Sequence, residues 1–184
     1  ADEIWVTEHP PVFSLGLNAC RDHLLATGNI PVVQIDRGGQ VTYHGPGMLM
    51  VDPLIDLKRL GLGVRDLVTA LEQSVVDLAA EYGIDASAKP EAPGVYVADT
   101  KFASVGLRIR RGASYHGMAL NVKVDLKPFM RINPCGYEGL QMTDLATLGG
   151  DSDLDAVREK LLPHFLRHLR LEDANVTSDP PTGG

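Results

Sequence analysis

Apolar residues recur at helical spacing in two parts of the chain. From Val64 to Tyr82 they fall on one face of a helix, and Gly83 is well placed to end that helix. A second apolar stripe begins after residues 151–153 and continues to Leu169. Pro163 lies inside this stripe and cannot donate a backbone hydrogen bond, so we expect a break or a kink there. The pattern therefore predicts two helices, the second of them broken or kinked at Pro163.

Shorter segments rich in β-branched and aromatic residues predict strands. They are Ile4 to Thr7, Val32 to Asp36, Leu49 to Ile55, Gly94 to Ala98, Phe102 to Arg110 and Ser114 to Val122. The last two flank Arg111-Gly112-Ala113, which is typical of a hairpin turn. Strands in the middle of the chain, with helices between and after them, predict a mixed α/β domain. We expect one domain over residues 1–175 and a disordered tail over residues 176–184.

Composition and charge exclude several classes of function. The formal net charge of −7 argues against a nucleic-acid binder, because phosphate groups attract a basic surface. No apolar run approaches the length that crosses a bilayer, and the first residues lack the basic start and apolar stretch of a signal peptide. We therefore expect a cytoplasmic protein that binds neither nucleic acid nor membrane.

The two cysteines of the chain have different surroundings. Neither is in a CxxC pair and the six histidines are dispersed, so we expect no metal site. Cys135 follows Pro134, which fixes φ, and precedes Gly136, which permits unusual dihedral angles, so the chain bends sharply there. Such a turn can present a nucleophilic sulfur to a cavity, and a buried structural cysteine is the alternative. Cys20 lacks such a context, and we interpret it as incidental.

The strand that begins near Lys101 alternates between two kinds of residue. One parity holds Lys101, Ala103, Val105, Leu107 and Ile109, and the other holds Arg108 and Arg110. Lys101 is therefore expected on the face that carries apolar residues. It either extends its ammonium group to solvent from the end of the strand or holds that group beside a thiol, where it favours the reactive thiolate.

A glycine-rich segment follows the predicted strand that ends at Asp36. It reads Asp36-Arg37-Gly38-Gly39-Gln40-Val41-Thr42-Tyr43-His44-Gly45-Pro46-Gly47. Glycines let a backbone approach a ligand closely, although a hairpin loop is the simpler interpretation. The GxxxxGK(S/T) and GxGxxG patterns of nucleotide sites are absent. Further along the chain, His116 is either a catalytic base for Cys135 or a hydrogen-bonded structural histidine, and spacing leaves both open.

Together these segments resemble the octanoyltransferases of lipoate biosynthesis, also called lipoyl(octanoyl) transferases or lipoate-protein ligase B. The similar stretches are Glu8–Gly16, Arg37–Gly47, Ala92–Val97, Lys101–Gly112, Ser114–Asn121, Asp125–Phe129 and Ile132–Tyr137. Several independent motifs in the same order make the resemblance specific, and it extends from about Glu3 to Leu145. It implies the fold of the biotin- and lipoate-ligase superfamily, a mixed sheet packed by helices. Members of the family usually begin a few tens of residues earlier, with a strand and a helix that this sequence lacks.

The resemblance implies roles for particular residues. The family cysteine that carries the acyl group as a thioester matches Cys135, and the family lysine that lowers the pKa of that cysteine matches Lys101. Three further segments match the family's substrate contacts. They are Arg37, Gly38, Gly39, Gln40, Val41, Thr42, Tyr43 and His44 of the glycine-rich segment, Ser104, Val105 and Gly106 of the strand, and Gly117, Met118 and Ala119.

The implied reaction moves an octanoyl group from octanoyl-acyl carrier protein to a lysine of a lipoyl domain. The acceptors would be the lipoyl domains of 2-oxoacid dehydrogenase complexes and the glycine cleavage H protein. The enzyme would act as a monomer without a cofactor, because the acyl group arrives on the phosphopantetheine of the carrier. The basic cluster of Arg108, Arg110 and Arg111 is then either a solvated strand edge or a docking site for an acidic carrier.

Three other interpretations stay open at this point. A cysteine thioesterase would use the same Cys135 but release free octanoate. An ATP-dependent lipoate ligase of the same superfamily would pass through an acyl-adenylate and need no cysteine. A non-catalytic module would bind an acyl group or a lipoyl domain, with Cys135 as inert packing.

Overall fold

The computed structural model describes residues 2–171. Its strands are β1 (Glu3–Thr7), β2 (Val12–Leu15), β3 (Val32–Gln34), β4 (Val41–His44), β5 (Met48–Leu54), β6 (Ser87–Lys89), β7 (Ala92–Val97), β8 (Thr100–Arg110) and β9 (Ala113–Asn121). Its α-helices are α1 (Leu57–Leu60), α2 (Val64–Glu81) and α3 (Leu154–His168), and its 3-10 helices are η1 (Arg21–His23), η2 (Lys127–Arg131) and η3 (Pro134–Gly136).

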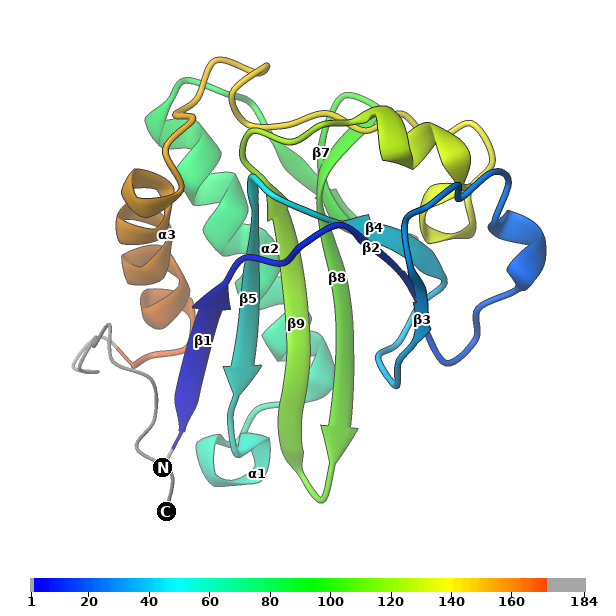
Figure 1. Ribbon diagram of the computed structural model, residues 1–184. Coiled ribbons are helices and arrows are strands. Elements are labelled where there is room, and N and C mark those ends of the chain that lie inside the picture. The colour runs from blue at the N-terminus through cyan, green and yellow to red at the C-terminus, as the bar shows by residue number, and fades with distance from the viewer. Residues whose placement is uncertain (1, 172–184) are drawn as a thin grey trace.

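The strands form two sheets (Figure 1). The larger has the order β1-β5-β9-β8-β7-β6, and each neighbouring pair in it is antiparallel. The smaller has the order β3-β2-β4, with β2 parallel to β3 and antiparallel to β4. Helices α2 and α3 cover one face of the larger sheet. The predicted mixed α/β fold with a sheet packed by helices is confirmed.

Alternate residues of β5 show how the core is divided. Leu49 and Val51 belong to the apolar cluster beneath α2 and α3. Met48 and Met50 point the other way, into a second cluster formed with β2, β4 and η2. Because successive side chains of a strand point to opposite faces, the larger sheet is covered on both sides. The smaller sheet is thereby packed over the face that the helices leave free.

The predicted helices exist, but the second is not broken. Helix α2 ends at Glu81, and Gly83 then takes a φ of +72°, as expected of a residue that ends a helix. Helix α3 continues through Pro163 to His168. Pro163 and Glu159, whose carbonyl would otherwise accept the missing hydrogen bond, both lie on the exposed side of the helix. Water can solvate that carbonyl, so of the two expected outcomes the break is wrong, and a kink at Pro163 stays a prediction.

Three strands were not predicted, namely β2, β4 and β6. Strand β4 lies inside the glycine-rich segment, for which a hairpin loop was the simpler interpretation, and all four residues of its sequence Val-Thr-Tyr-His are buried. The strand predicted at residues 32–36 ends at Gln34. The predicted tail lies outside the described residues. Within residues 2–171, none of the helices combines the length and apolar character that a bilayer crossing requires.

Candidate active site

Cys135 lies on a tight turn formed by the η3 segment. The backbone amide of Gly136 donates to the carbonyl of Asn133 at 3.0 Å, and that of Tyr137 donates to the carbonyl of Pro134 at 3.0 Å. These bonds hold Cys135 at φ 55° and ψ 21°, in the left-handed region. A residue other than glycine pays roughly 1–3 kcal/mol for such a conformation. The sharp bend predicted from Pro134 and Gly136 is confirmed, and the cysteine is partly exposed.

Lys101 reaches the sulfur from strand β8. Its Nζ donates to the Sγ of Cys135 at 3.0 Å, and the residue is only 2% exposed. The main chain of Lys101 is fixed as well, since its amide donates to Gln141 and its carbonyl accepts from Thr143, each at 2.9 Å. The interpretation that Lys101 extends to solvent is therefore wrong. The structure instead buries its ammonium beside the thiol.

A β-bulge explains why Lys101 faces the cysteine. Residue Val95 of β7 pairs with Ala103, but the next residue of β7 pairs with Lys101, so Phe102 has no partner in β7. Both Phe102 and Ala103 enter the apolar cluster beneath the helices. Lys101 therefore shares a face with Ser104, whose Oγ lies 3.9 Å from the Sγ of Cys135. The predicted parity of Lys101 is wrong, because the extra residue reverses the alternation.

Two residues of β7 enclose the lysine side chain. Gly94 has a φ of +138°, and a Cβ built on it would lie 2.5 Å from the Cε of Lys101. The Nζ of Lys101 also lies 5.7 Å from the ring centroid of Tyr96. Burial, followed by the charge of Cys135, raises the pKa of Tyr96 to about 12. Both residues belong to the stretch that resembles the family, but the sequence alone gave them no role.

Arg37 is a buried cation at the start of the glycine-rich segment. Its Nη2 donates to the carbonyl of Ser14 at 2.7 Å and to the carbonyl of Gln40 at 2.8 Å, and its Nη1 donates to the carbonyl of Gly38 at 2.9 Å. These acceptors are neutral. Burial lowers the pKa of Arg37, and the negative charge of Cys135 acts in the opposite direction. The guanidinium thus adds positive charge near the sulfur.

The same segment touches both the strand and the cysteine turn. The amide of Gly38 donates to the carbonyl of Leu107 at 3.0 Å. A Cβ on Gly106 would lie 3.0 Å from the carbonyl oxygen of Gly38, and one on Gly136 would lie 2.8 Å from the Cγ of Gln40. A side chain would crowd both contacts, and Gly39 takes a φ of +88° in the same loop. The structure therefore brings the loop, β8 and the cysteine turn together.

The remaining predicted residues of this segment form β4. Val41 and Tyr43 pack in the second apolar cluster, and Thr42 pairs with Ser14 of β2. His44 is buried, with its Nε2 2.9 Å from the Oγ of Ser14. Burial, and then the charge of Arg37, lowers the pKa of His44 to about 3, so this histidine is neutral at pH 7. It supports the hydroxyl group that accepts from Arg37.

The two other predicted segments are hydrogen-bonded neighbours in the sheet. Their register pairs Ser104 with Ala119, Val105 with Met118, and Gly106 with Gly117. Met118 and Val105 pack into the cluster beneath the helices, whereas Ala119 belongs to the cluster on the opposite face. Ser104 and Ala119 are thus on the cysteine side of the sheet, and the side chain of Met118 is on the other side.

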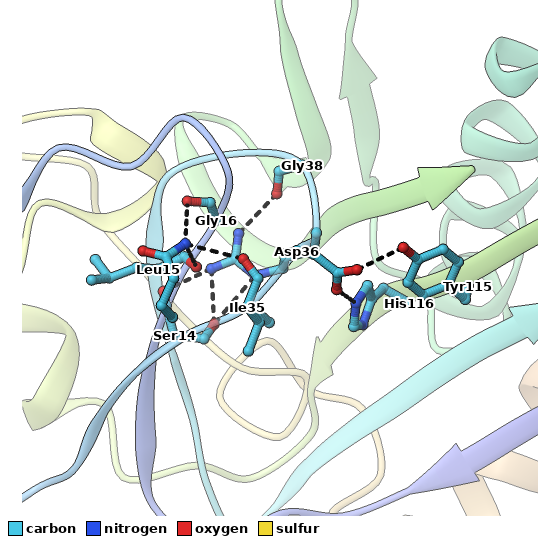
Figure 2. A network of polar contacts seen from close by, with 10 residues as sticks. Ser14, Leu15, Gly16, Ile35, Asp36, Gly38, Tyr115 and His116 are labelled. Atoms are coloured by element: carbon cyan, nitrogen blue, oxygen red, sulfur yellow. Dashed lines mark hydrogen bonds and ion pairs between the residues drawn. The ribbon is translucent and has the colours of Figure 1, made fainter. Parts of the chain in front are cut away.

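His116 bonds to a carboxylate rather than to the cysteine. Its Nε2 lies 2.8 Å from Oδ1 of Asp36, and the hydroxyl of Tyr115 donates to Oδ2 of the same carboxylate at 2.6 Å (Figure 2). These two bonds lower the pKa of Asp36 to about 2. The contacts favour the interpretation of His116 as a hydrogen-bonded structural histidine.

The basic cluster lies at the far end of β8 from Lys101. Arg108, Arg110 and Arg111 are exposed, and the last of them opens the hairpin turn with a φ of +54°. Seven residues of strand separate Lys101 from Arg108, which corresponds to about 23 Å. Among the residues from 2 to 171 there is no group of three His, Cys, Asp or Glu that could hold a metal ion.

Comparison with known sequences gives consistent matches over most of the chain. The model of the family described as lipoyl protein ligase A/B catalytic domain matches residues 1–166. An octanoyltransferase of Pseudomonas entomophila is 60% identical over 168 residues, which are 91% of this chain and 78% of the relative. An octanoyltransferase of Cellvibrio japonicus is 56% identical over 179 residues, which are 97% of this chain and 83% of the relative.

Solved structures with low sequence identity share the fold. A bipartite lipoate protein ligase from Thermoplasma acidophilum superposes with a TM-score of 0.65 at 17% identity, covering 92% of this chain and 71% of that chain. Biotin protein ligase from Aquifex aeolicus superposes with a TM-score of 0.57 at 18% identity, covering 85% of this chain and 70% of that chain. The predicted biotin- and lipoate-ligase superfamily fold is confirmed.

Proposed function

The chain belongs to the lipoyl protein ligase A/B catalytic domain family and is an octanoyltransferase of lipoate biosynthesis, and from this premise we propose that Cys135 carries the octanoyl group between donor and acceptor. The observation that carries the proposal is the 3.0 Å contact between Nζ of Lys101 and Sγ of Cys135. An ammonium at that distance favours the thiolate, which is the form that attacks a carbonyl.

In the first step, the thiolate of Cys135 attacks the thioester carbonyl of octanoyl-acyl carrier protein. The carbon–sulfur bond to the carrier's phosphopantetheine breaks, and the octanoyl-Cys135 thioester remains. The charge of Arg37 supports the anionic sulfur from the loop side. Backbone amides of the glycine-rich loop are the proposed donors to the tetrahedral oxyanion.

In the second step, the amine of a lipoyl-domain lysine attacks octanoyl-Cys135 and forms an amide. The proposed acceptors are the lipoyl domains of 2-oxoacid dehydrogenase complexes and the glycine cleavage H protein. Exchange between thioesters is nearly balanced, and conversion of a thioester to an amide is downhill, so no nucleotide or other cofactor is required. We place the reaction in the cytoplasm.

The proposal is tested by intact mass spectrometry in two stages. The protein is first incubated with octanoyl-acyl carrier protein alone, and we expect a mass increase of one octanoyl group. Addition of a lipoyl domain should then move that mass to the domain. Release of free octanoate instead would support a thioesterase, and transfer without any adduct on the enzyme would contradict a covalent intermediate.

The basic cluster provides a second prediction, about the carrier. The double variant Arg108→Glu with Arg110→Glu should raise the KM for carrier-bound octanoate several-fold, because each exposed ion pair contributes roughly 0.2–1 kcal/mol. The KM for an octanoyl thioester of a short thiol should not change. The comparison is made by steady-state kinetics at low and high salt, and the difference should shrink as salt rises.

A matched control places the same charge reversal elsewhere. Arg158 and Lys160 lie on α3, which covers the helix side of the larger sheet. The double variant Arg158→Glu with Lys160→Glu should leave the KM for the carrier substrate unchanged. If the two double variants behave alike, net charge rather than docking explains the effect, and an unchanged KM in the first excludes this docking site.

A further inference from the structure

Glu72 is a buried carboxylate beneath the Cys135–Lys101 pair. It lies on the sheet-facing side of α2, among the apolar residues that form the core, and is only 8% exposed. Its Oε2 accepts the backbone amide of Gly94 in β7 at 2.8 Å. A charged side chain loses its hydration in such a place, and a neutral glutamine would make the same hydrogen bond at lower cost. The position therefore suggests a use for the charge.

Gly94 connects this carboxylate to Lys101. A Cβ on Gly94 would lie 2.5 Å from the Cε and 3.2 Å from the Nζ of Lys101, so the lysine side chain packs directly against the backbone of Gly94. Glu72 fixes the position of that backbone through its hydrogen bond with the Gly94 amide. Helix α2 contacts both β7 and β8, so carboxylate, glycine and ammonium form one continuous arrangement.

The charges around these groups come from four elements. Lys101 on β8 is faced by Cys135 from η3, by Tyr96 from β7 and by Glu72 from α2. Glu72 in turn is faced by Lys101 and Tyr96. Burial raises the pKa of Glu72, while the Gly94 amide and the charge of Lys101 act in the opposite direction. Glu72 thus brings a carboxylate toward Lys101 from the helix side of the larger sheet.

We propose that Glu72 is a positioning residue that acts through Lys101 in the second half of the reaction. The proposal rests on the thioester mechanism above. During acylation, the carrier thiol leaves with the proton of the Lys101 ammonium, so that octanoyl-Cys135 and a neutral Lys101 amine remain. During transfer, the acceptor nitrogen bonds to the carbonyl carbon, the bond to Cys135 breaks, and the proton of the acceptor returns to Lys101. The ammonium and the thiolate are thereby restored.

Glu72 matters most when the sulfur is acylated. The sulfur of octanoyl-Cys135 is neutral, so the thiolate that faces Lys101 in the free enzyme is gone. The carboxylate of Glu72 remains, and an opposite charge favours the protonated form of a lysine. It keeps Lys101 basic enough to accept the proton of the incoming amine.

The variant Glu72→Gln removes the charge and keeps an oxygen that can accept the Gly94 amide. In single-turnover experiments we expect acylation within about 3-fold of wild type and the maximal rate of amide formation to fall about 10-fold. The midpoint of the pH profile for amide formation should move to lower pH by about one unit, because the amine of Lys101 has lost its anionic neighbour. The same lipoyl domain is the acceptor for wild type and for Glu72→Gln, so the titration of its own lysine affects both pH profiles equally.

The control is Glu81→Gln, which removes a carboxylate from the exposed end of the same helix. Its rates and pH profile should match wild type. If wild type forms no octanoyl adduct, the proposed function fails. If wild type forms the adduct and Glu72→Gln keeps the wild-type midpoint, or slows both steps equally, Glu72 has only a structural role and the present proposal is overturned.

A second variant covers the case in which Glu72→Gln does not fold. Glu72→Asp keeps the charge but is too short to reach the Gly94 amide as the glutamate does. Its pH midpoint should stay near that of wild type even if its stability falls. A midpoint displaced to lower pH by about one unit, with the charge still present, would contradict the proposal.

Discussion

Cys135→Ala should abolish octanoyl transfer, with kcat/KM for carrier-bound octanoate reduced more than about 10⁴-fold. The sulfur is the atom that accepts the acyl group, and the hydroxyl of Ser104, 3.9 Å from Sγ, does not ionise as a thiol does, so we expect no replacement by it. The octanoyl adduct seen by mass spectrometry should also be lost. Alanine has the same backbone preferences as cysteine, so the left-handed turn should cost the variant no more than it costs wild type.

Cys20→Ala is the matched control for this variant. Cys20 is exposed and is the other cysteine of the chain, and its contact with Gln40 uses its backbone amide. We expect wild-type rates and a wild-type adduct. Substantial transfer by Cys135→Ala would exclude a thioester on this residue. Activity that persists only with ATP would support a ligase mechanism instead.

Lys101→Met should slow transfer by about 10²- to 10⁴-fold, the range that a proton-transferring group contributes. Methionine can occupy the space of the buried lysine side chain beside Gly94 without introducing a charge, so we expect little loss of thermal stability. Cys135 should also react more slowly with an alkylating reagent at pH 7, because the ammonium 3.0 Å from its sulfur is gone. Stopped-flow kinetics of acylation and the rate of alkylation measure the two effects separately.

Lys101→Arg separates the charge of the lysine from its ability to lose a proton. An arginine stays protonated in proteins, so it can support the thiolate but cannot accept a proton from the acceptor amine. We expect this variant to form more acyl-enzyme than Lys101→Met does and to stall before amide formation. Lys89→Met is the control, since the ammonium of Lys89 also lies over the ring of Tyr96, at 4.5 Å, but pairs with Asp99. If Lys101→Met transfers at the wild-type rate, the role of Lys101 in proton transfer is excluded.

The sequence predicts those parts of this fold that depend on local periodicity. Helix α2 and the β8–β9 hairpin follow from spacing and from a turn with glycine. The site segments were identified by their resemblance to a family, and only the structure brings Gly106 and Gly136 close to the glycine-rich loop and Lys101 close to Cys135. Local patterns do not encode distances between segments that are far apart in the chain.

Two features could not be read from the sequence for physical reasons. Phe102 and Ala103 look like alternating strand residues, and only the pairing with β7 reveals that one is extra. Glu72 lies between Leu71 and Val75 on the apolar stripe of α2, which is a signal, but a charge at the edge of a stripe is usually solvated. Its burial depends on the position of β7, which the helix pattern does not specify.

The bulge at Phe102 gives the strand of Lys101 two adjacent core residues in place of one. One unpaired residue allows a single strand to anchor Phe102 and Ala103 in the core and to turn Lys101 and Ser104 toward the sulfur. Deletion of Phe102 would restore the regular alternation of β8, so Lys101 and Ser104 would still share the face of the sheet that carries the sulfur. The core would instead lose a fully buried aromatic side chain. The extra residue therefore contributes to the rigidity of the strand that carries the lysine, and not to the direction in which the lysine points.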